Sequence, residues 1–259
     1  MTEQQHLRIE TPEAHPHVAV VTLDRPPVNA LSRDLVTELR TTFLSFRERR
    51  DLRCVILTGS GDRAFCSGAD VKEMSVRTTQ SMLERSVGTR DMFEAIRRCP
   101  VPVIGAINGH AVGAGTVLAS LCDIVLAAEE ATFSLPEIVI GVMGGTRHTS
   151  TIVPEKLMRY MALTGRRVSA RMMERVGGVI SVVPRGELMA EAFVLADEIA
   201  TRSPSAVRLM KEAIGLSEDL PVAEGYRVEQ LFTTLASSLP DAKEASLAWL
   251  EKRAPVWSE

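Results

Sequence analysis

Residues 103–128 read VIGAINGHAVGAGTVLASLCDIVLAA, and this stretch contains one acidic residue and neither lysine nor arginine. The apolar run at 103–107 predicts a buried strand, and the glycines at 109–115 predict a turn directly after it. Residues 116–122 predict a short helix, and residues 124–128 predict a second strand. The order of strand, turn, helix and strand is typical of an α/β fold.

A similar unit lies upstream of this stretch. Residues 18–23 (VAVVTL) predict a strand, the turn signal DRPP follows at 24–27, and leucines at 31, 35 and 39 predict a helix. Ser32 is the expected N-cap of that helix, and residues 54–57 (CVIL) predict the next buried strand. A strand–helix–strand unit of this kind normally forms a parallel pair with a right-handed crossover.

The last third of the chain is predicted to be mostly helical. Helical spacing of apolar residues begins at Pro154, and a short strand is expected at 179–183. Further helices are expected around 186–201, 205–214 and 242–252. No stretch has the composition of a linker or the pattern of an internal repeat. We therefore expect one functional unit, with a core at 1–195 and a helical region at 196–259.

The composition disfavours several classes of protein. The chain has 259 residues, of which 45% are hydrophobic and 24% charged, and a formal net charge of −3, so neither disorder nor a nucleic-acid partner is expected. No window of about 18 residues is apolar and uncharged throughout. The start MTEQQHLRIE has neither a basic segment nor an apolar run. We therefore expect a cytoplasmic protein without a membrane segment.

The cysteines and histidines show no metal or disulfide pattern. The four cysteines stand at 54, 66, 99 and 122 with no CxxC pair, so we expect core thiols. The five histidines stand at 6, 15, 17, 110 and 148, and they form no HExxH motif or three-ligand cluster. Neither a metal site nor a separate cofactor is expected.

Two turns expose backbone N–H groups, AFCSGAD at 64–70 and AVGAG at 111–115. Their glycine spacing matches neither GxGxxG nor the phosphate-binding P-loop, and the chain has no GxSxG motif, so nucleotide-fold and serine-hydrolase functions lose support. Small residues let a ligand approach the main chain, and two N–H groups that face one point could stabilise a carbonyl oxygen gaining negative charge. The alternative is that these glycines serve only tight turns and helix packing.

Glu137 stands in the apolar segment FSLPEIVIGVMGG at 133–145. Burial of a carboxylate among apolar residues would raise its pKa toward a value that suits proton transfer. The alternative is a structural carboxylate at a helix start, beside Pro136. Together with the two turns, the motif predicts a base near a pair of N–H groups.

Four motifs resemble the crotonase (enoyl-CoA hydratase/isomerase) family: AFCSGADVKEM at 64–74, PVIGAINGHAVGAG at 102–115, CDIVLAAEEATFSLPEIVIG at 122–141 and LTGRRVSA at 163–170. The segment DAKEASLAWLEKRAPVW at 241–257 is similar to the closing helix of that family, so the resemblance spans nearly the whole chain. It implies an α/β spiral of ββα turns with a helical C-terminal trimerisation region. It also implies an acyl-CoA thioester as substrate and a homotrimer or hexamer.

The resemblance assigns roles to residues of this chain. It places the two oxyanion-hole amides on Ala69 and Ala114, and many relatives have a glycine where this chain has Ala114. The segment Ser67 to Val71 corresponds to the stretch that holds adenine through main-chain groups, and Arg25 lies where relatives often have a basic residue near the nucleotide. The other residues expected to contact the acyl-CoA are Gly68, Asp70, Gly113, Val117 and Pro136.

Position 117 departs from the best-known hydratases of the family, which use two glutamates. Glu137 matches the glutamate of the PE motif, but the other position holds Val117. Water addition needs a group that activates water and a proton for the α-carbon, whereas a single carboxylate can shift a double bond. The pattern therefore favours a double-bond isomerase with Glu137 as its base. Hydration, hydratase-lyase chemistry and a non-catalytic acyl-CoA-binding role stay open.

Overall fold

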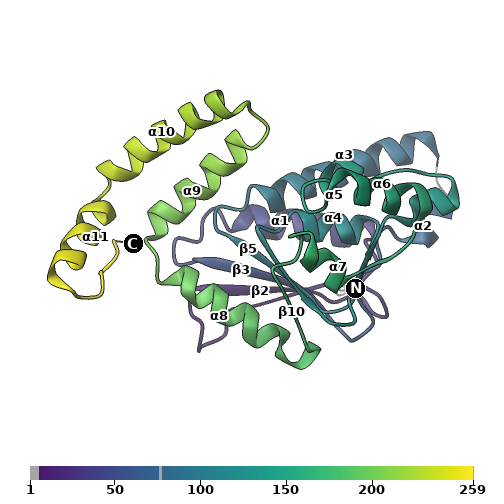
Figure 1. The fold of residues 1–259 in the computed structure, drawn as a ribbon. Coiled ribbons are helices and arrows are strands. Elements are labelled where there is room, and N and C mark those ends of the chain that lie inside the picture. The colour runs from purple at the N-terminus through teal and green to yellow at the C-terminus, as the bar shows by residue number, and fades with distance from the viewer. Residues whose placement is uncertain (1–5, 76–77, 259) are drawn as a thin grey trace.

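The computed structural model describes residues 6–75 and 78–258. Within these residues a six-stranded sheet forms the centre of the fold, in the strand order β1-β2-β3-β5-β7-β10 (Figure 1). Its strands are β1 (Leu7–Glu10), β2 (Val18–Leu23), β3 (Cys54–Gly59), β5 (Val103–Ile107), β7 (Ile124–Ala128) and β10 (Ser181–Val183). β1 pairs antiparallel with β2, and all other neighbours pair parallel, as expected for strands connected through helices.

A second sheet contains four short strands in the described part of the chain. They are β4 (Ala64–Cys66), β6 (His110–Val112), β8 (Thr132–Ser134) and β9 (Val168–Ser169). β4, β6 and β8 each follow a strand of the central sheet, and each is followed by a helix or a 3₁₀ helix. This repeated order confirms the expected ββα spiral. The segment at 109–115, expected to be a turn, contains β6, because parallel pairing with β4 and β8 supplies partners that the local pattern does not show.

Helices cover both faces of the central sheet (Figure 1). One face carries α1 (Arg33–Ser45), α3 (Thr79–Arg97) and α4 (Ala114–Ser120), and the other carries α8 (Leu188–Ala200). Side chains of a strand alternate between the faces: Ala19 and Val21 pack in the core under α1, and Val18 and Val20 pack against α8. Ser32 caps α1, as predicted, by accepting a hydrogen bond from the Leu35 amide at 3.2 Å.

Short helices complete the core. They are α2 (Val71–Ser75), α5 (Thr146–Thr149), α6 (Glu155–Thr164), α7 (Ala170–Arg175) and the 3₁₀ helices η1 (Pro136–Ile140) and η2 (Arg185–Glu187). Two expected boundaries are wrong. α4 begins at Ala114 and not at Thr116, because Gly113, with a positive φ of 55°, ends the turn there. The strand expected at 179–183 begins only at Ser181, where pairing with β7 starts.

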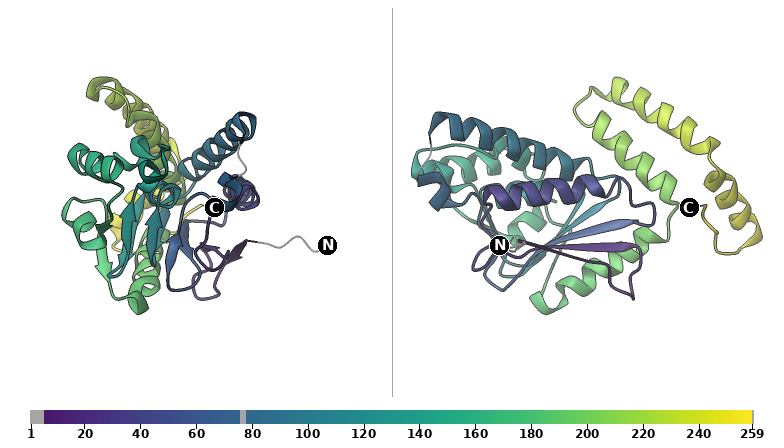
Figure 2. Two further views of the ribbon diagram at one scale, coloured as in Figure 1. Left: turned by 90° about the vertical axis from the view of Figure 1, so that its right-hand side faces the viewer. Right: turned by 180° about the vertical axis from the view of Figure 1, so that it is seen from behind.

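Three helices extend from the sheet as an arm: α9 (Pro204–Ser217), α10 (Val222–Ser238) and α11 (Pro240–Glu251) (Figure 2). α9 and α11 correspond to the helices expected around 205–214 and 242–252, whereas the sequence pattern does not predict α10. α10 fully buries only Gly225, and the half-buried Val228, Phe232 and Ala236 follow it at helical spacing, in keeping with its packing against α9. The division into 1–195 and 196–259 stays a prediction, and its boundary falls within α8.

The four cysteines are free and buried, which confirms the expectation of core thiols. Burial raises the pKa of Cys66 to about 12, because the thiolate would lose its hydration there. The thiols of this interior are therefore protonated at neutral pH. Among the helices of residues 6–75 and 78–258, none combines the length and the apolar composition that a membrane crossing requires.

Candidate active site

The turn at 67–70 fixes the direction of the Ala69 amide. Leu31 donates its N–H to the carbonyl of Gly68 at 2.8 Å and accepts from the amide of Asp70 at 3.1 Å. Because a peptide unit is planar and trans, the Gly68 carbonyl and the Ala69 N–H point in opposite directions. The bond to Leu31 therefore turns the Ala69 N–H away from that segment. Gly68 has φ 82°, a value that favours glycine at this position.

The second turn places the amide of Ala114 at the start of α4. Gly113 has φ 55° and ψ −118°, which would strain any other residue, and its carbonyl accepts from the Val117 amide at 3.1 Å. The same planarity directs the Ala114 N–H away from the helix. Ala114 keeps an ordinary backbone conformation, since positive φ among the described non-glycine residues occurs at Asn29 and Lys252.

The two turns lie against each other. A Cβ atom added to Gly68 would lie 3.4 Å from the Ala114 nitrogen, and one added to Gly115 would overlap the Cys66 carbonyl. Glycine at both positions thus lets the two segments approach closely. Among the described residues, neither the Ala69 amide nor the Ala114 amide has a hydrogen-bond acceptor. The structure therefore brings together the two N–H groups that the sequence singled out, and leaves both free to bind a ligand.

Glu137 lies directly over Gly113. It is the second residue of η1, after Pro136, and its Oε1 occupies the space that a side chain at Gly113 would need. Its other oxygen, Oε2, is buried without a hydrogen-bond partner among the described residues. Burial raises the pKa of Glu137 above its ordinary value, because the charged form loses hydration. The predicted base thus lies beside the Ala114 turn.

Two buried apolar side chains belong to the segments that carry the turn and the carboxylate, Val117 on α4 and Leu135 directly before η1. Val117 and Leu135 are each 1% exposed. A Cβ atom on Gly145 would lie 3.0 Å from Cγ2 of Val117 and 2.9 Å from Cδ2 of Leu135, so the two side chains meet over Gly145. Val117 lies one helical turn after Gly113, whose carbonyl accepts a hydrogen bond from the Val117 amide. Leu135 and Gly145 both stand in the motif at 133–145 that carries Glu137, but no role was predicted for either of them.

Two residues assigned to the nucleotide form an ion pair beside the Ala69 turn. Arg25 donates to Oδ2 of Asp70 at 2.6 Å and to the carbonyl of Ala30 at 3.1 Å. Burial acts to raise the pKa of Asp70, but hydrogen bonds from the Lys72 amide and from Arg25 outweigh it and hold the pKa below its ordinary value. Asp70 is therefore an ionised carboxylate that anchors the turn.

The other residues assigned to adenine flank Ala69. Ser67 donates its amide to the carbonyl of Val28 at 3.0 Å, which anchors the start of the turn. Val71 begins α2 and is 71% exposed, so a ligand can reach it. The predicted site residues thus gather in the segments 67–71, 113–117 and 136–137, with Arg25 bonded to the first of them.

Comparison with known proteins identifies the family that the sequence motifs resemble. The family described as "Enoyl-CoA hydratase/isomerase" matches residues 13–259. The chain belongs to this family. It is 36% identical to the "Probable enoyl-CoA hydratase, mitochondrial" of Dictyostelium discoideum, over 95% of this chain and 90% of the relative. It is 35% identical to the "Carnitinyl-CoA dehydratase" of Salmonella typhi, over 99% of each.

Solved structures of the enoyl-CoA hydratase/isomerase family share the fold. The crystal structure of an enoyl-CoA hydratase from Bacillus anthracis matches with a TM-score of 0.93 at 35% identity, and it covers 98% of this chain and 99% of that one. The crotonase-type α/β fold with a helical C-terminal region is therefore confirmed. The protein is a crotonase-family acyl-CoA enzyme.

Proposed function

We propose that this enzyme moves the double bond of a 3-enoyl-CoA to the 2-position, with Glu137 as its single acid/base. The main support is the combination of one carboxylate at the start of α4 with an apolar residue one helical turn further along. Glu137 lies over Gly113, beside the Ala114 amide, while the position one turn further along holds the buried Val117. The site therefore offers one carboxylate where the best-known hydratases that this chain resembles use two.

The proposed reaction uses the two turns and the carboxylate together. The thioester oxygen accepts hydrogen bonds from the amides of Ala69 and Ala114, and Glu137 removes a proton from the α-carbon. The resulting dienolate carries negative charge on the oxygen, where the two amides stabilise it. Glu137 then returns the same proton to the γ-carbon, the carbonyl re-forms, and the double bond lies between the α- and β-carbons.

The surroundings of Glu137 suit this proton shuttle. Its raised pKa makes the carboxylate a stronger base toward a carbon acid, and the Oε2 atom has no competing hydrogen bond among the described residues. Val117 and Leu135 supply an apolar wall that disfavours an ordered water. The raised pKa and the free Oε2 favour proton transfer by Glu137, and the apolar side chains favour return of the proton to substrate carbon over attack by water.

Hydration is the second candidate, because the Dictyostelium and Salmonella relatives are named as a hydratase and a dehydratase. The absence of a second carboxylate at position 117 argues against hydration. One positioned acid/base group contributes about 10²–10⁴-fold, which corresponds to roughly 3–5 kcal/mol of transition-state stabilisation. Hydratase-lyase chemistry and non-catalytic binding of acyl-CoA are further alternatives, and the placement of Glu137 over Gly113, in the turn that carries the Ala114 amide, argues against a purely binding role.

Product analysis of the purified protein with 3-enoyl-, 2-enoyl- and hydroxycinnamoyl-CoA tests the proposal. Glu137→Gln, expressed and purified in the same way, is the control for contaminating activity. We expect 2-enoyl-CoA from the 3-enoyl substrate as the fastest reaction. Faster formation of 3-hydroxyacyl-CoA would replace the isomerase assignment by a hydratase, and release of an aldehyde from the hydroxycinnamoyl substrate would indicate a lyase.

The ligand contacts and the assembly belong to the same proposal. We place the nucleotide of coenzyme A along Ser67 to Val71, with Arg25 nearby, and we expect a homotrimer or hexamer. The arm carries exposed apolar side chains that a neighbouring copy would bury. The most exposed large ones are Val222 (89%), Trp249 (83%), Leu250 (76%) and Leu231 (72%). Light scattering that shows a stable monomer at micromolar concentration would contradict the assembly.

The cytoplasmic location expected from the sequence also stays a prediction. The Dictyostelium relative is named as mitochondrial, a compartment different from the one expected here. Fractionation of the native host cells, with detection of this chain in each fraction, is the measurement that checks it.

A further inference from the structure

Arg85 of α3 reaches the chain segment that holds the Ala69 turn. Its Nη2 donates to the carbonyl of Leu31 at 2.9 Å, and its Nη1 donates to Oε2 of Glu73 at 2.8 Å. The Arg85 side chain is 12% exposed, although arginine side chains mostly lie in water. Both ends of this guanidinium are therefore used inside the protein.

The backbone of Leu31 connects Arg85 to the oxyanion-hole amide. The Leu31 carbonyl accepts from both Arg85 and the Asp70 amide, and the Leu31 N–H donates to the Gly68 carbonyl. The Gly68 carbonyl and the Ala69 N–H belong to one planar peptide unit, so a displacement of Leu31 would rotate that N–H. Arg85 can thereby act on the direction of the amide without contact to the substrate.

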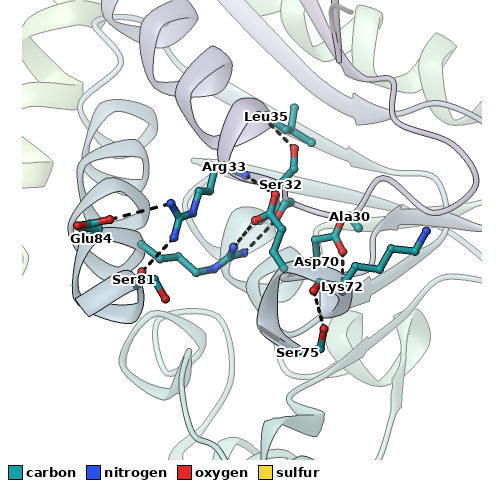
Figure 3. A network of polar contacts seen from close by, with 12 residues as sticks. Ala30, Ser32, Arg33, Leu35, Asp70, Lys72, Ser75, Ser81 and Glu84 are labelled. Carbon is teal, nitrogen blue, oxygen red and sulfur yellow. Dashed lines mark hydrogen bonds and ion pairs between the residues drawn. The ribbon is translucent and has the colours of Figure 1, made fainter. Parts of the chain in front are cut away.

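Glu73 orients Arg85 and joins three helices. Its Oε1 accepts from the Arg33 amide at 3.2 Å, at the first residue of α1, while its Oε2 accepts from Arg85 on α3. Figure 3 shows the Arg33 guanidinium directed toward Ser81 and Glu84 of α3, on the exposed side of the same network. α1, α2 and α3 thus meet at one carboxylate.

We propose that Arg85 is a positioning residue for the Ala69 amide and that Glu73 holds Arg85 in place, a role that rests on the proposed function because it concerns the same pair of amides. Arg25 bonds the carbonyl that precedes the one bonded by Arg85, so two arginines hold the consecutive carbonyls at 30–31. Loss of Arg85 frees one of the two. The Ala69 amide should then sample directions away from the substrate oxygen.

Arg85→Met tests this role, because methionine keeps much of the side-chain volume and removes both donors. Arg33→Met is the matched control: Arg33 lies in the same α1–α3 network, its side chain is 54% exposed, and its guanidinium makes no bond to the Leu31 carbonyl. We expect the single-turnover rate of Arg85→Met to fall between about ten- and a hundredfold, as for a displaced oxyanion donor. The control should stay within about twofold, since exposed ion pairs contribute little. Arg85→Lys should recover part of the rate, and Glu73→Gln should show a smaller fall.

Two readouts separate positioning from a loss of fold. A thioether analogue of the substrate lacks the carbonyl, so Arg85→Met should bind it as the wild-type enzyme does. The Raman spectrum of the bound thioester should show a less polarised carbonyl stretch in Arg85→Met and an unchanged one in Arg33→Met.

An unchanged rate per folded molecule together with an unchanged carbonyl stretch would overturn the proposal, and so would equal losses of thioether and thioester binding. A wild-type enzyme that turns over no enoyl-CoA would contradict the proposed function alone, because the carbonyl stretch of a bound thioester still reports on the Ala69 amide.

Discussion

The two turns that present the paired amides are held in place by different means. The Ala114 turn is held by the packing of small groups. Thr116 is fully buried, and its hydroxyl lies 2.8 Å from the Ala111 carbonyl and 2.9 Å from the Ser134 carbonyl. Gly113 and the first turn of α4 complete this arrangement with backbone hydrogen bonds.

The Ala69 turn is held by charged side chains that come from elsewhere in the chain. Arg25 bonds Asp70 within the turn, and Arg85 bonds the Leu31 carbonyl that receives the Asp70 amide. Changes of volume should therefore disturb the Ala114 turn most, whereas changes of charge should disturb the Ala69 turn. Substitutions can therefore distinguish the two ways in which the turns are held, and some of them also test the role proposed for Glu137.

The largest effect is expected from Glu137→Gln, which asks whether both turns serve one reaction. Glutamine keeps nearly the same shape but cannot accept a proton, so the rate should fall by at least about 10²–10⁴-fold. Affinity for acyl-CoA should stay close to that of the wild-type enzyme, because the nucleotide and the two amides supply it. Single-turnover rates paired with calorimetric binding provide the check. A variant that retains more than about a tenth of the wild-type rate would sink the assignment.

Gly113→Ala should have the next largest effect, because it adds volume to the turn that packing holds. The new methyl group would overlap Oε1 of Glu137 and displace the base. We expect a rate loss of about 10²-fold or more. Gly177→Ala is the matched control, since Gly177 also has a positive φ, of 80°, but has open space around it. The control should lose about 1 kcal/mol of stability and keep its rate per folded molecule; equal rate losses in both variants would argue against the overlap.

Val117→Glu introduces a charged side chain into the closely packed first turns of α4, next to the Ala114 turn. The new glutamate supplies the second carboxylate that the site lacks for the activation of water. The ratio of hydration to isomerisation should therefore rise by about tenfold or more. Two carboxylates at close range raise each other's pKa, and burial of the new one costs stability, so the gain should stay below the full value of one acid/base group. The product ratio on protein shown to be folded by circular dichroism is the measurement. An unchanged ratio would count against the role assigned to position 117.

The smallest effect is expected from pH, and its sign differs between the two regions. Glu137 has a raised pKa, so its contribution to stability is present below the unfolded-state pKa and is lost as pH rises through the folded-state pKa. Asp70 has a lowered pKa, so its contribution is present above the unfolded-state pKa and is lost as pH falls through the folded-state pKa.

Melting temperatures measured from acidic to neutral pH check the direction of both pH dependences of stability. The advantage of Glu137→Gln over the wild-type protein should grow with rising pH, whereas the deficit of Asp70→Asn should shrink with falling pH. The acid limb of the rate should lie above the ordinary glutamate pKa of about 4.3. The same pH trend in both variants would show that one of the two assignments of charge is wrong.

The parts of the molecule that could be predicted from the sequence are those determined by the residue pattern within one short segment. The strands at 18–23, 103–107 and 124–128 carry continuous apolar runs, and the structure has them with those bounds. The segments 67–71 and 113–117 were also recognisable, because glycine and alanine at fixed spacing permit close approach of backbones.

The rest depends on contacts that no local pattern records. Arg85 and the Leu31 carbonyl are 54 residues apart in sequence, and nothing about an arginine in a polar helix indicates that bond. Leu135 and Gly145 stand in the motif at 133–145, but their packing against Val117 depends on the return of the chain to α4. α10 has a partly buried face at Gly225, Val228, Phe232 and Ala236. Its exposed Val222, Leu231 and Leu235 lie outside that face and obscure the helical period in the sequence.

The shared volume at Gly113 and Glu137 also constrains how the family can diverge. While the carboxylate keeps its present place, a residue larger than glycine at position 113 would collide with Oε1 and displace the base. A lineage that first loses the carboxylate removes this steric barrier, and only the cost of the positive φ remains. The two positions should therefore show sign-dependent epistasis. Once a side chain has settled at 113, a single substitution restores the glutamate but not its place over the turn, so loss of this base would be difficult to reverse.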